Sequence, residues 1–317
     1  MTAKLDGLVV RTQSGFLTVE TAHGDYTCRL RGRLKQGETE GDIAAVGDRV
    51  VILPHEDGSG MIDEIKPRHS VFSRVRTGIK RDFQQIILAN PDQIVAVFAC
   101  AEPEPHLRML DRFLVIAEKQ HLHAVIVANK IDLVSLEAAK VLFGNYTQLG
   151  YTVIYTSAHT GQGVDTLREH LQGKISALAG PSGVGKSSLL NSIQPQLGLH
   201  VREVSEATEK GRHTTQVREL FPLDVGGYVA DTPGIRSLAL WDTEPEELDA
   251  YFVEMRDLVA GCKFSDCTHT HEPGCAVRAA VDAGRVSPER YLSYLRLRFE
   301  DDSTAYAEDL NAPPSLG

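Results

Sequence analysis

The sequence lacks any apolar run that approaches the roughly 20 residues needed to span a bilayer. Residues 1–6 lack the apolar segment of a secretion signal. The chain has one tryptophan and five cysteines among its 317 residues, and an odd number of cysteines without an export signal argues against a disulfide framework. We therefore expect a cytoplasmic protein that does not enter a membrane.

A positive net charge is also missing, because the formal charge is −10 at pH 7. A protein that coats nucleic acid without selectivity needs clustered cations, so this class is excluded and any contact with RNA must be local. The hydrophobic fraction of 42% and the charged fraction of 24% are those of a globular chain, and 317 residues suffice for two or three domains.

Three regions differ in their apolar pattern. The first contains five short alternating segments broken by glycines, which predicts a small β-barrel. The second alternates apolar strands with helical segments, which predicts an α/β P-loop domain with a mainly parallel sheet. The third predicts a helix over residues 246–259, a Cys/His cluster and a second helix. The expected boundaries are 1–70 for the barrel, 71–81 for a basic linker, 82–243 for the α/β domain, 244–300 for a helical zinc-binding domain and 301–317 for a flexible tail.

Residues 180–187 fit the phosphate-binding pattern GxxxxGK[ST] between an apolar strand and a helix. Backbone N–H groups of such a loop surround phosphate oxygens at a helix N-terminus, where the helix dipole favours an anion. Lys186 is then expected at the β- and γ-phosphate oxygens, and Ser187 as a ligand of Mg²⁺. The expected phosphate contacts are Gly180, Pro181, Ser182, Gly183, Val184, Gly185, Lys186 and Ser187.

Residues 129–132 read Asn-Lys-Ile-Asp after an apolar strand and match the guanine-reading pattern NKxD. Asp132 can accept hydrogen bonds from the N1–H and 2-amino groups of guanine, a donor pair that adenine does not present. Lys130 can lie along the base, and Asn129 can tie this loop to the phosphate loop. Alone, the motif also fits a helix cap at Asp132. Residues 156–158, Thr-Ser-Ala, match the segment that backs the base, with Ser157 and Ala158 as contacts, so the two motifs together predict GTP.

A third motif, Asp-Thr-Pro-Gly at 231–234, follows a short strand. Asp231 is expected beside Mg²⁺, and the N–H of Gly234 at the γ-phosphate. Thr214 is the expected second hydroxyl ligand of Mg²⁺, with Thr215 as the alternative. The motifs occur with the base motif first and the phosphate loop third, so the site is circularly permuted relative to ordinary GTPases. Such a site survives rejoining of the chain, because loops at the carboxyl ends of parallel strands form it.

The residue after this motif is Ile235, where a glutamine would orient the attacking water, so we expect slow intrinsic hydrolysis. His213, before the threonines, is the candidate to position water. The alternative is a surface histidine without a catalytic part.

Cys262, Cys267, His269 and Cys275 supply three thiolates and one imidazole, a ligand set suited to a closed tetrahedral Zn²⁺ site. Such a site is structural, because no coordination position is left for a substrate. His271 is an alternative to His269.

Four cations alternate along the third segment of the barrel, and a strand there would present them all on one face as an RNA-binding surface. They are Arg29, Arg31, Arg33 and Lys35. The alternative is a solvated charged strand.

The combination of NKxD, Ser-Ala, GPSGVGKSSLLN, GRHTT and DTPG with CxxxxCxHxxxxxC and a barrel containing CRLRGRLK closely resembles the ribosome small-subunit-dependent GTPase A family of the RsgA/YjeQ type. The resemblance implies an OB-fold, a permuted GTPase domain and a zinc-binding domain. It also implies GTP hydrolysis stimulated by the small ribosomal subunit, late action in maturation of that subunit, and contact with 16S rRNA. It adds Ser188 to the phosphate contacts and matches the family's proposed catalytic histidine to His213.

Three other functions fit parts of the sequence. A permuted GTPase could act on the large subunit or another RNA, and a binding factor could use GTP only as a ligand that locks its shape. A small-molecule P-loop kinase leaves NKxD and the cysteines unexplained. We expect a monomer that binds GTP and GDP.

Overall fold

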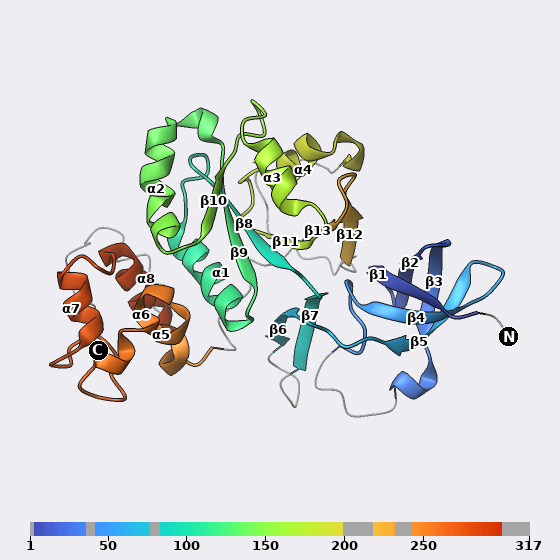
Figure 1. Cartoon of the computed structure of the whole chain (residues 1–317), viewed down its shortest axis with the longest axis horizontal. Helices are drawn as coiled ribbons and strands as arrows, with labels where there is room; N and C mark the ends of the chain where they lie inside the picture. Colours follow the sequence, from blue (N-terminus) through green and yellow to red (C-terminus); the bar gives the residue numbers. More distant parts are fainter. Residues whose placement is uncertain (1–2, 36–41, 77–82, 199–217, 232–242, 300–317) are drawn as a thin grey trace, which may run out of the picture. The chain divides into compact units, whose positions relative to one another are not determined.

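The computed structural model describes residues 3–35, 42–76, 83–198, 218–231 and 243–299. The chain divides into two compact units, Met1–Asp242 and Thr243–Gly317 (Figure 1). Every strand that the described residues form belongs to the first unit, and the second contains short helices around a loop rich in cysteine and histidine. In the described part of the chain, no helix has the length and apolarity needed to cross a bilayer.

The first five strands close into a small barrel, which confirms the expected OB-like fold. β1 pairs antiparallel with both β2 and β4, and this double pairing closes the sheet. β3 pairs in parallel with β5. The strands are β1 (Leu5–Gln13), β2 (Phe16–Thr21), β3 (Gly24–Leu30), β4 (Arg49–Pro54) and β5 (Ser59–Ile65). Side chains that alternate toward the inside form the core: Val9, Leu17, Val19, Cys28, Val50, Ile52 and Ile62.

The expectation that one strand presents all four cations is wrong. β3 ends at Leu30, and residues Gly32–Lys35 form the 3-10 turn η1, where the Leu34 N–H donates to the Arg31 carbonyl at 2.9 Å. Gly32 has no side chain to pack on the sheet, and the side chains of Arg31 and Arg33 both bind Asp63 of β5. Arg31 and Arg33 therefore bind a shared carboxylate instead of extending the strand.

Part of the expected linker is a strand. β6 (Val71–Arg76) pairs antiparallel with β7 (Phe83–Ala89) in a separate two-stranded sheet. The side-chain amide of Gln120, at the end of α1 (Leu107–Lys119), accepts from the Ser73 N–H and donates to the Ser73 carbonyl, both at 3.2 Å. These two bonds fix β6 to the helix.

The second half of the first unit is an α/β domain whose parallel strands follow the order β10-β9-β8-β11-β13, which confirms the expected class. The order runs from β8 to β10 in one direction and from β11 to β13 in the other, and loops at the carboxyl ends of the strands beside such a reversal form ligand sites in open α/β sheets. The strands are β8 (Gln93–Ala99), β9 (His123–Asn129), β10 (Thr152–Tyr155), β11 (Ile175–Ala179) and β13 (Tyr228–Asp231). The connecting helices are α1, α2 (Leu136–Gln148), α3 (Val164–Leu171) and α4 (Lys186–Ile193), with the 3-10 turns η2 (Ile131–Leu133) and η3 (Pro195–Leu197).

An antiparallel strand, β12 (Arg218–Pro222), joins this sheet to the barrel. β12 pairs with β13 on one side and with β1 on the other, where Arg11 lies opposite Glu219. The Tyr228 hydroxyl also donates to the Glu20 carboxylate at 2.8 Å. No motif in the sequence predicts this junction.

The second unit has no long helix at 246–259, so that expectation is wrong. The segment breaks at Phe252, which has an extended ψ of 102° between α5 and α6. The buried ring of Phe252 lies edge-on to Tyr294 with centroids 5.6 Å apart, and the Arg290 guanidinium covers it at 4.5 Å. Arg290 also forms two hydrogen bonds with Glu254, at 2.6 and 3.0 Å. The elements are η5 (Pro245–Glu247), α5 (Leu248–Tyr251), α6 (Val253–Arg256), η6 (Val259–Gly261), α7 (Ala276–Asp282) and α8 (Pro288–Arg298).

Candidate nucleotide site and metal centre

The phosphate-loop motif connects β11 to α4. Gly180 has a φ of +142°, and a Cβ there would lie 2.1 Å from the Val97 carbonyl oxygen, so only glycine lets the loop approach β8 this closely. Lys186 begins α4, and its ammonium donates to the carbonyls of Gly180 and Pro181 at 2.9 and 2.7 Å. The loop thus surrounds its own cation at a helix N-terminus, an arrangement suited to anionic phosphate.

Asn129, the last residue of β9, holds the base motif to the phosphate loop. Its side chain is 1% exposed, and Nδ2 donates to the Val184 carbonyl at 2.8 Å. Its Oδ1 accepts from the Thr156 hydroxyl at 3.1 Å. Gly185 has a φ of +94°, and a Cβ there would lie 2.5 Å from Asn129 Nδ2. The structure therefore brings together three motifs that are separate in sequence.

Lys130 and Asp132 follow Asn129 in a tight turn. Lys130 has a left-handed φ of 62°, and its ammonium donates to the Glu102 carbonyl. Asp132 lies in η2 and is exposed, so its carboxylate is open to a ligand. The pKa of the neighbouring Cys100 thiol is raised to about 11, mainly by burial and to a smaller extent by the negative charge of Asp132. This thiol is therefore neutral at pH 7.

The base-backing segment is attached to both other motifs. The Ile131 N–H donates to the Thr156 carbonyl at 3.2 Å. Ser157 is buried, and its hydroxyl accepts from the Thr160 N–H at 3.1 Å. The Ser192 hydroxyl of α4 donates to the Ala158 carbonyl at 3.2 Å.

Some expected residues lie at the border of the described chain or beyond it. Asp231 ends β13, where its backbone pairs with Leu178 of β11, directly before the phosphate loop. Ser187 and Ser188 are half-buried in the first turn of α4. His213, Thr214, Thr215 and Gly234 lie outside the described residues.

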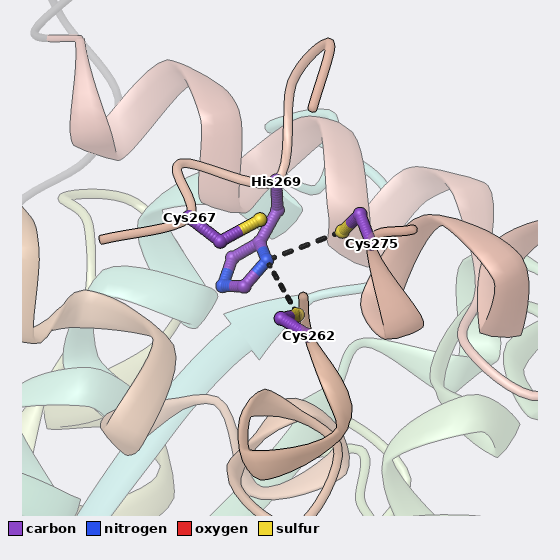
Figure 2. Close-up of side chains that lie close together, drawn as sticks. All are labelled: Cys262, Cys267, His269 and Cys275. Atoms are coloured by element: carbon purple, nitrogen blue, oxygen red, sulfur yellow. Dashed lines mark hydrogen bonds between the residues drawn. The ribbon is translucent and has the colours of Figure 1, made fainter. Parts of the chain in front are cut away.

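The Cys/His cluster is closely gathered in the second unit (Figure 2). The ligand atoms of Cys262, Cys267, His269 and Cys275 all lie within 4.8 Å of one another. His269 Nδ1 faces the Sγ atoms of Cys262 and Cys275 at 3.6 and 3.3 Å. Zinc–sulfur bonds of about 2.3 Å in a tetrahedron put ligand atoms roughly 3.8 Å apart, so this donor set fits a Cys₃His metal site.

The loop around His269 is fixed by acidic side chains that the sequence analysis missed. His269 Nε2, the nitrogen that faces away from the sulfurs, lies 3.0 Å from the Asp249 carboxylate. Burial raises the pKa of Glu272, but hydrogen bonds from Thr268 and Thr270 outweigh it and lower the value to about 2. The alternative ligand His271 is exposed and bonds the Thr270 hydroxyl at 2.8 Å, so it is not a member of the cluster.

The four expected RNA-binding cations occupy different surroundings. Arg29 lies over the ring of Phe16, and Arg31 and Arg33 bind the buried carboxylate of Asp63. The backbone of Lys35 ends η1, and its side chain lies outside the described part. No sequence spacing signals Asp63 or Asp249, because each meets its partners only through tertiary folding.

Family models match most of the chain. A model described as RsgA GTPase matches residues 65–241, and one described as the RsgA N-terminal domain matches residues 6–62. A curated relative from Gemmatimonas aurantiaca, named small ribosomal subunit biogenesis GTPase RsgA, is 49% identical over 305 residues, covering 95% of this chain and 98% of the relative. A relative of the same name from Moorella thermoacetica is 47% identical over 291 residues, with coverages of 92% and 95%.

Two solved structures are similar over nearly the whole chain. The crystal structure of YjeQ from Thermotoga maritima superposes with a TM-score of 0.76 at 40% identity, covering 94% of this chain and 98% of that one. YloQ, described as a circularly permuted GTPase, superposes with a TM-score of 0.72 at 33% identity, with coverages of 94% and 95%.

Proposed function

The chain belongs to the RsgA GTPase family, and on this premise we propose that it hydrolyses GTP on the small ribosomal subunit and acts late in maturation of that subunit. Both relatives described above are named small ribosomal subunit biogenesis GTPases, which supports the small subunit as the partner of this chain. The observation that carries the nucleotide assignment is the bond from Asn129 to Val184, because it joins a guanine-reading motif to a phosphate loop.

In the proposed nucleotide site, the loop at 180–188 binds the phosphates and Lys186 donates to their oxygens. Asp132 reads the N1–H and 2-amino groups of guanine, Lys130 lies along the base, and Ser157 and Ala158 back it. Asp231 and Gly234 contact the Mg²⁺ and γ-phosphate side. Ser187 and Thr214 would hold Mg²⁺, which neutralises phosphate charge when bound.

We assign the positioning of the attacking water to His213, because Ile235 cannot do it. This assignment rests on the sequence. If docking on the subunit brings the His213 imidazole within reach of the attacking water, hydrolysis depends on the subunit.

We assign Zn²⁺ to Cys262, Cys267, His269 and Cys275, with a structural role. Four protein ligands leave no coordination position for a substrate. In a unit this small, a bound metal supplies stability that a limited apolar core does not.

The barrel surface around Arg29, Arg31 and Arg33 is the proposed contact with 16S rRNA, and Lys35 is a further candidate from the sequence. The proposed division remains a barrel over 1–70, a basic segment over 71–81, a GTPase domain over 82–243, a zinc-binding domain over 244–300 and a tail over 301–317. We further propose that the protein is a cytoplasmic monomer.

Co-sedimentation with separated ribosomal subunits tests this function. The full chain with a non-hydrolysable GTP analogue is expected to sediment with small subunits, and the chain with GDP is expected to remain in the supernatant. Sedimentation with large subunits instead would favour the large-subunit alternative. In a separate nucleotide-binding measurement, equal affinities for ATP and GTP would overturn the guanine assignment.

A further inference from the structure

The outer face of β2, β3 and β5 carries a row of exposed side chains whose apolar members have no role so far. Leu17 pairs with Cys28 and both are buried, so Phe16 and Arg29, the adjacent positions, stand opposite each other on the outside. The Arg29 guanidinium lies 4.3 Å from the centroid of the Phe16 ring. Arg29 is also the register partner of Met61 on its other side.

The row is unusual because two exposed apolar side chains flank an exposed guanidinium. Phe16 is 40% exposed and Met61 is 36% exposed, and both belong to the small set of large apolar side chains that the described residues expose. Single exposed apolar residues need no explanation, but here two of them border one guanidinium on adjacent strands. An aromatic ring and a guanidinium plane in contact form a surface on which a flat ring can stack.

A cation cluster lies beside the end of this row. Lys4 Nζ and Arg33 Nη2 lie 2.7 and 2.9 Å from the Asp63 carboxylate, and Arg31 binds it as well. The Asp63 side chain is 3% exposed, whereas those of the three cations are about half exposed. Three positive charges around one negative charge leave a local excess of two. Arg31 directly follows the end of β3, where its N–H donates to the Ile62 carbonyl at 3.1 Å, and Asp63 follows Ile62 in β5. The cluster therefore lies next to the end of the row.

We propose that this face is a stacking site for an unpaired ribonucleotide, with the base against the Phe16–Arg29 pair, Met61 at its edge and the phosphates on the cations that Asp63 holds. The proposal rests on the proposed function and narrows it from rRNA in general to single-stranded rRNA. An unpaired base exposes its faces to aromatic and guanidinium groups, whereas a duplex encloses them.

Charge favours RNA over a protein partner. The chain carries a net charge of −10, so the local excess of cations in this cluster departs from the charge of the chain as a whole. Phosphates complement it at every nucleotide, and the apolar row beside it accepts the base.

The test compares four chains: the unmodified protein, Phe16→Tyr, Phe16→Leu and Phe16→Ala. The matched control is Val141→Ala, which removes an apolar side chain that is 84% exposed on α2. The probes are a single-stranded oligoribonucleotide of about 12 nucleotides, the corresponding duplex, and small ribosomal subunits. GTP affinity and zinc content of each variant serve as checks of folding.

We expect the unmodified chain to prefer the single strand to the duplex, and Phe16→Tyr to retain this binding because it keeps the ring. Phe16→Leu and Phe16→Ala are expected to lose about 5- to 150-fold in affinity for the single strand and to bind small subunits less tightly, while Val141→Ala changes neither affinity.

Full retention of single-strand affinity by Phe16→Leu, or equal affinity of the unmodified chain for duplex and single strand, overturns the stacking site. If Phe16→Ala loses small-subunit binding while the unmodified chain binds neither oligonucleotide, the face contacts a protein, and the stacking site is also overturned. Failure of the proposed function is distinct, because the unmodified chain would then not bind small subunits.

Discussion

The side-chain nitrogen Nδ2 of Asn129 lies 2.8 Å from the carbonyl oxygen of Val184, 55 residues later in the chain. In the permuted order the base motif precedes the phosphate loop, so tertiary contacts must fix the one against the other. This bond does so between two loops that follow different strands, β9 and β11.

Replacement of Asn129 by alanine is expected to weaken GTP and GDP binding alike. The change leaves the Val184 carbonyl without its donor, and a buried group that loses its partner costs about 1–3 kcal/mol, which corresponds to about 5- to 150-fold in affinity. Titration calorimetry with both nucleotides measures the effect, and Gln148→Ala, an exposed amide on α2, is the control. Unchanged affinity for both nucleotides would contradict the role of this bond.

Asp132→Asn is expected to lower affinity for GTP and raise relative affinity for xanthosine triphosphate. The amide presents a donor where the guanine 2-amino group needs an acceptor, whereas xanthine offers an oxygen there. Competition against a fluorescent nucleotide gives both affinities. A variant that keeps the GTP preference of the unmodified chain would show that Asp132 does not read the base.

The bond between His269 Nε2 and Asp249 predicts a change in metal affinity. With Nδ1 on the metal, the Nε2–H donates to the carboxylate, which orients the ring and strengthens the ligand. The purified chain is expected to hold one zinc, and Asp249→Ala to weaken it by about 10- to 100-fold in competition with a chelator. The zinc affinity of Asp249→Asn should lie between those of the unmodified chain and Asp249→Ala, because the amide keeps an acceptor without the charge.

The control for this prediction is Asp257→Ala, which removes an exposed carboxylate of the same unit. Protein prepared without chelator that contains no zinc would contradict the metal assignment. Equal zinc affinities for Asp249→Ala and Asp257→Ala would remove Asp249 from it.

Asp63 predicts a pH dependence of barrel stability. Hydrogen bonds from Lys4 and Arg31 lower the pKa of this carboxyl to about 2, against an ordinary value near 3.9. A lowered pKa in the folded state contributes stability above the ordinary pKa, and that contribution is lost as pH falls toward 2. The difference in Tm between the unmodified chain and Asp63→Asn should therefore be constant from pH 7 to 5 and shrink below pH 4. A difference at pH 3 equal to that at pH 7 would contradict the ion cluster.

The barrel, the α/β sheet and the metal ligands could be predicted because their signals are local. Strand alternation, the glycines of the phosphate loop and the spacing from Cys262 to Cys275 are each written in a short stretch of sequence. The break of the helix at Phe252 could not be predicted, because it depends on packing against Tyr294, about 40 residues later.

The cations at the end of β3 show the same limit of prediction from sequence. Alternation of arginines favoured one strand through Lys35, but Asp63 on another strand draws Arg31 and Arg33 together after β3 has ended. Pairing of β12 with β1 was equally hidden, because it joins residues about 200 positions apart. In each case the deciding partner is distant in sequence.

His213→Ala is expected to retain nucleotide and subunit binding and to lose most of the subunit-stimulated turnover. If positioning one water is its whole task, the loss in stimulated rate is about 100-fold, with a smaller loss in the basal rate. Single-turnover hydrolysis with and without small subunits measures both. A variant stimulated as strongly as the unmodified chain would remove His213 from the mechanism.

The most direct test of the account is the rate of GTP turnover by the full chain alone, with purified small subunits and with purified large subunits. We predict slow turnover alone, strong stimulation by small subunits and none by large subunits. The same slow rate in all three conditions, or stimulation by large subunits, would contradict the proposal that this GTPase acts on the small subunit.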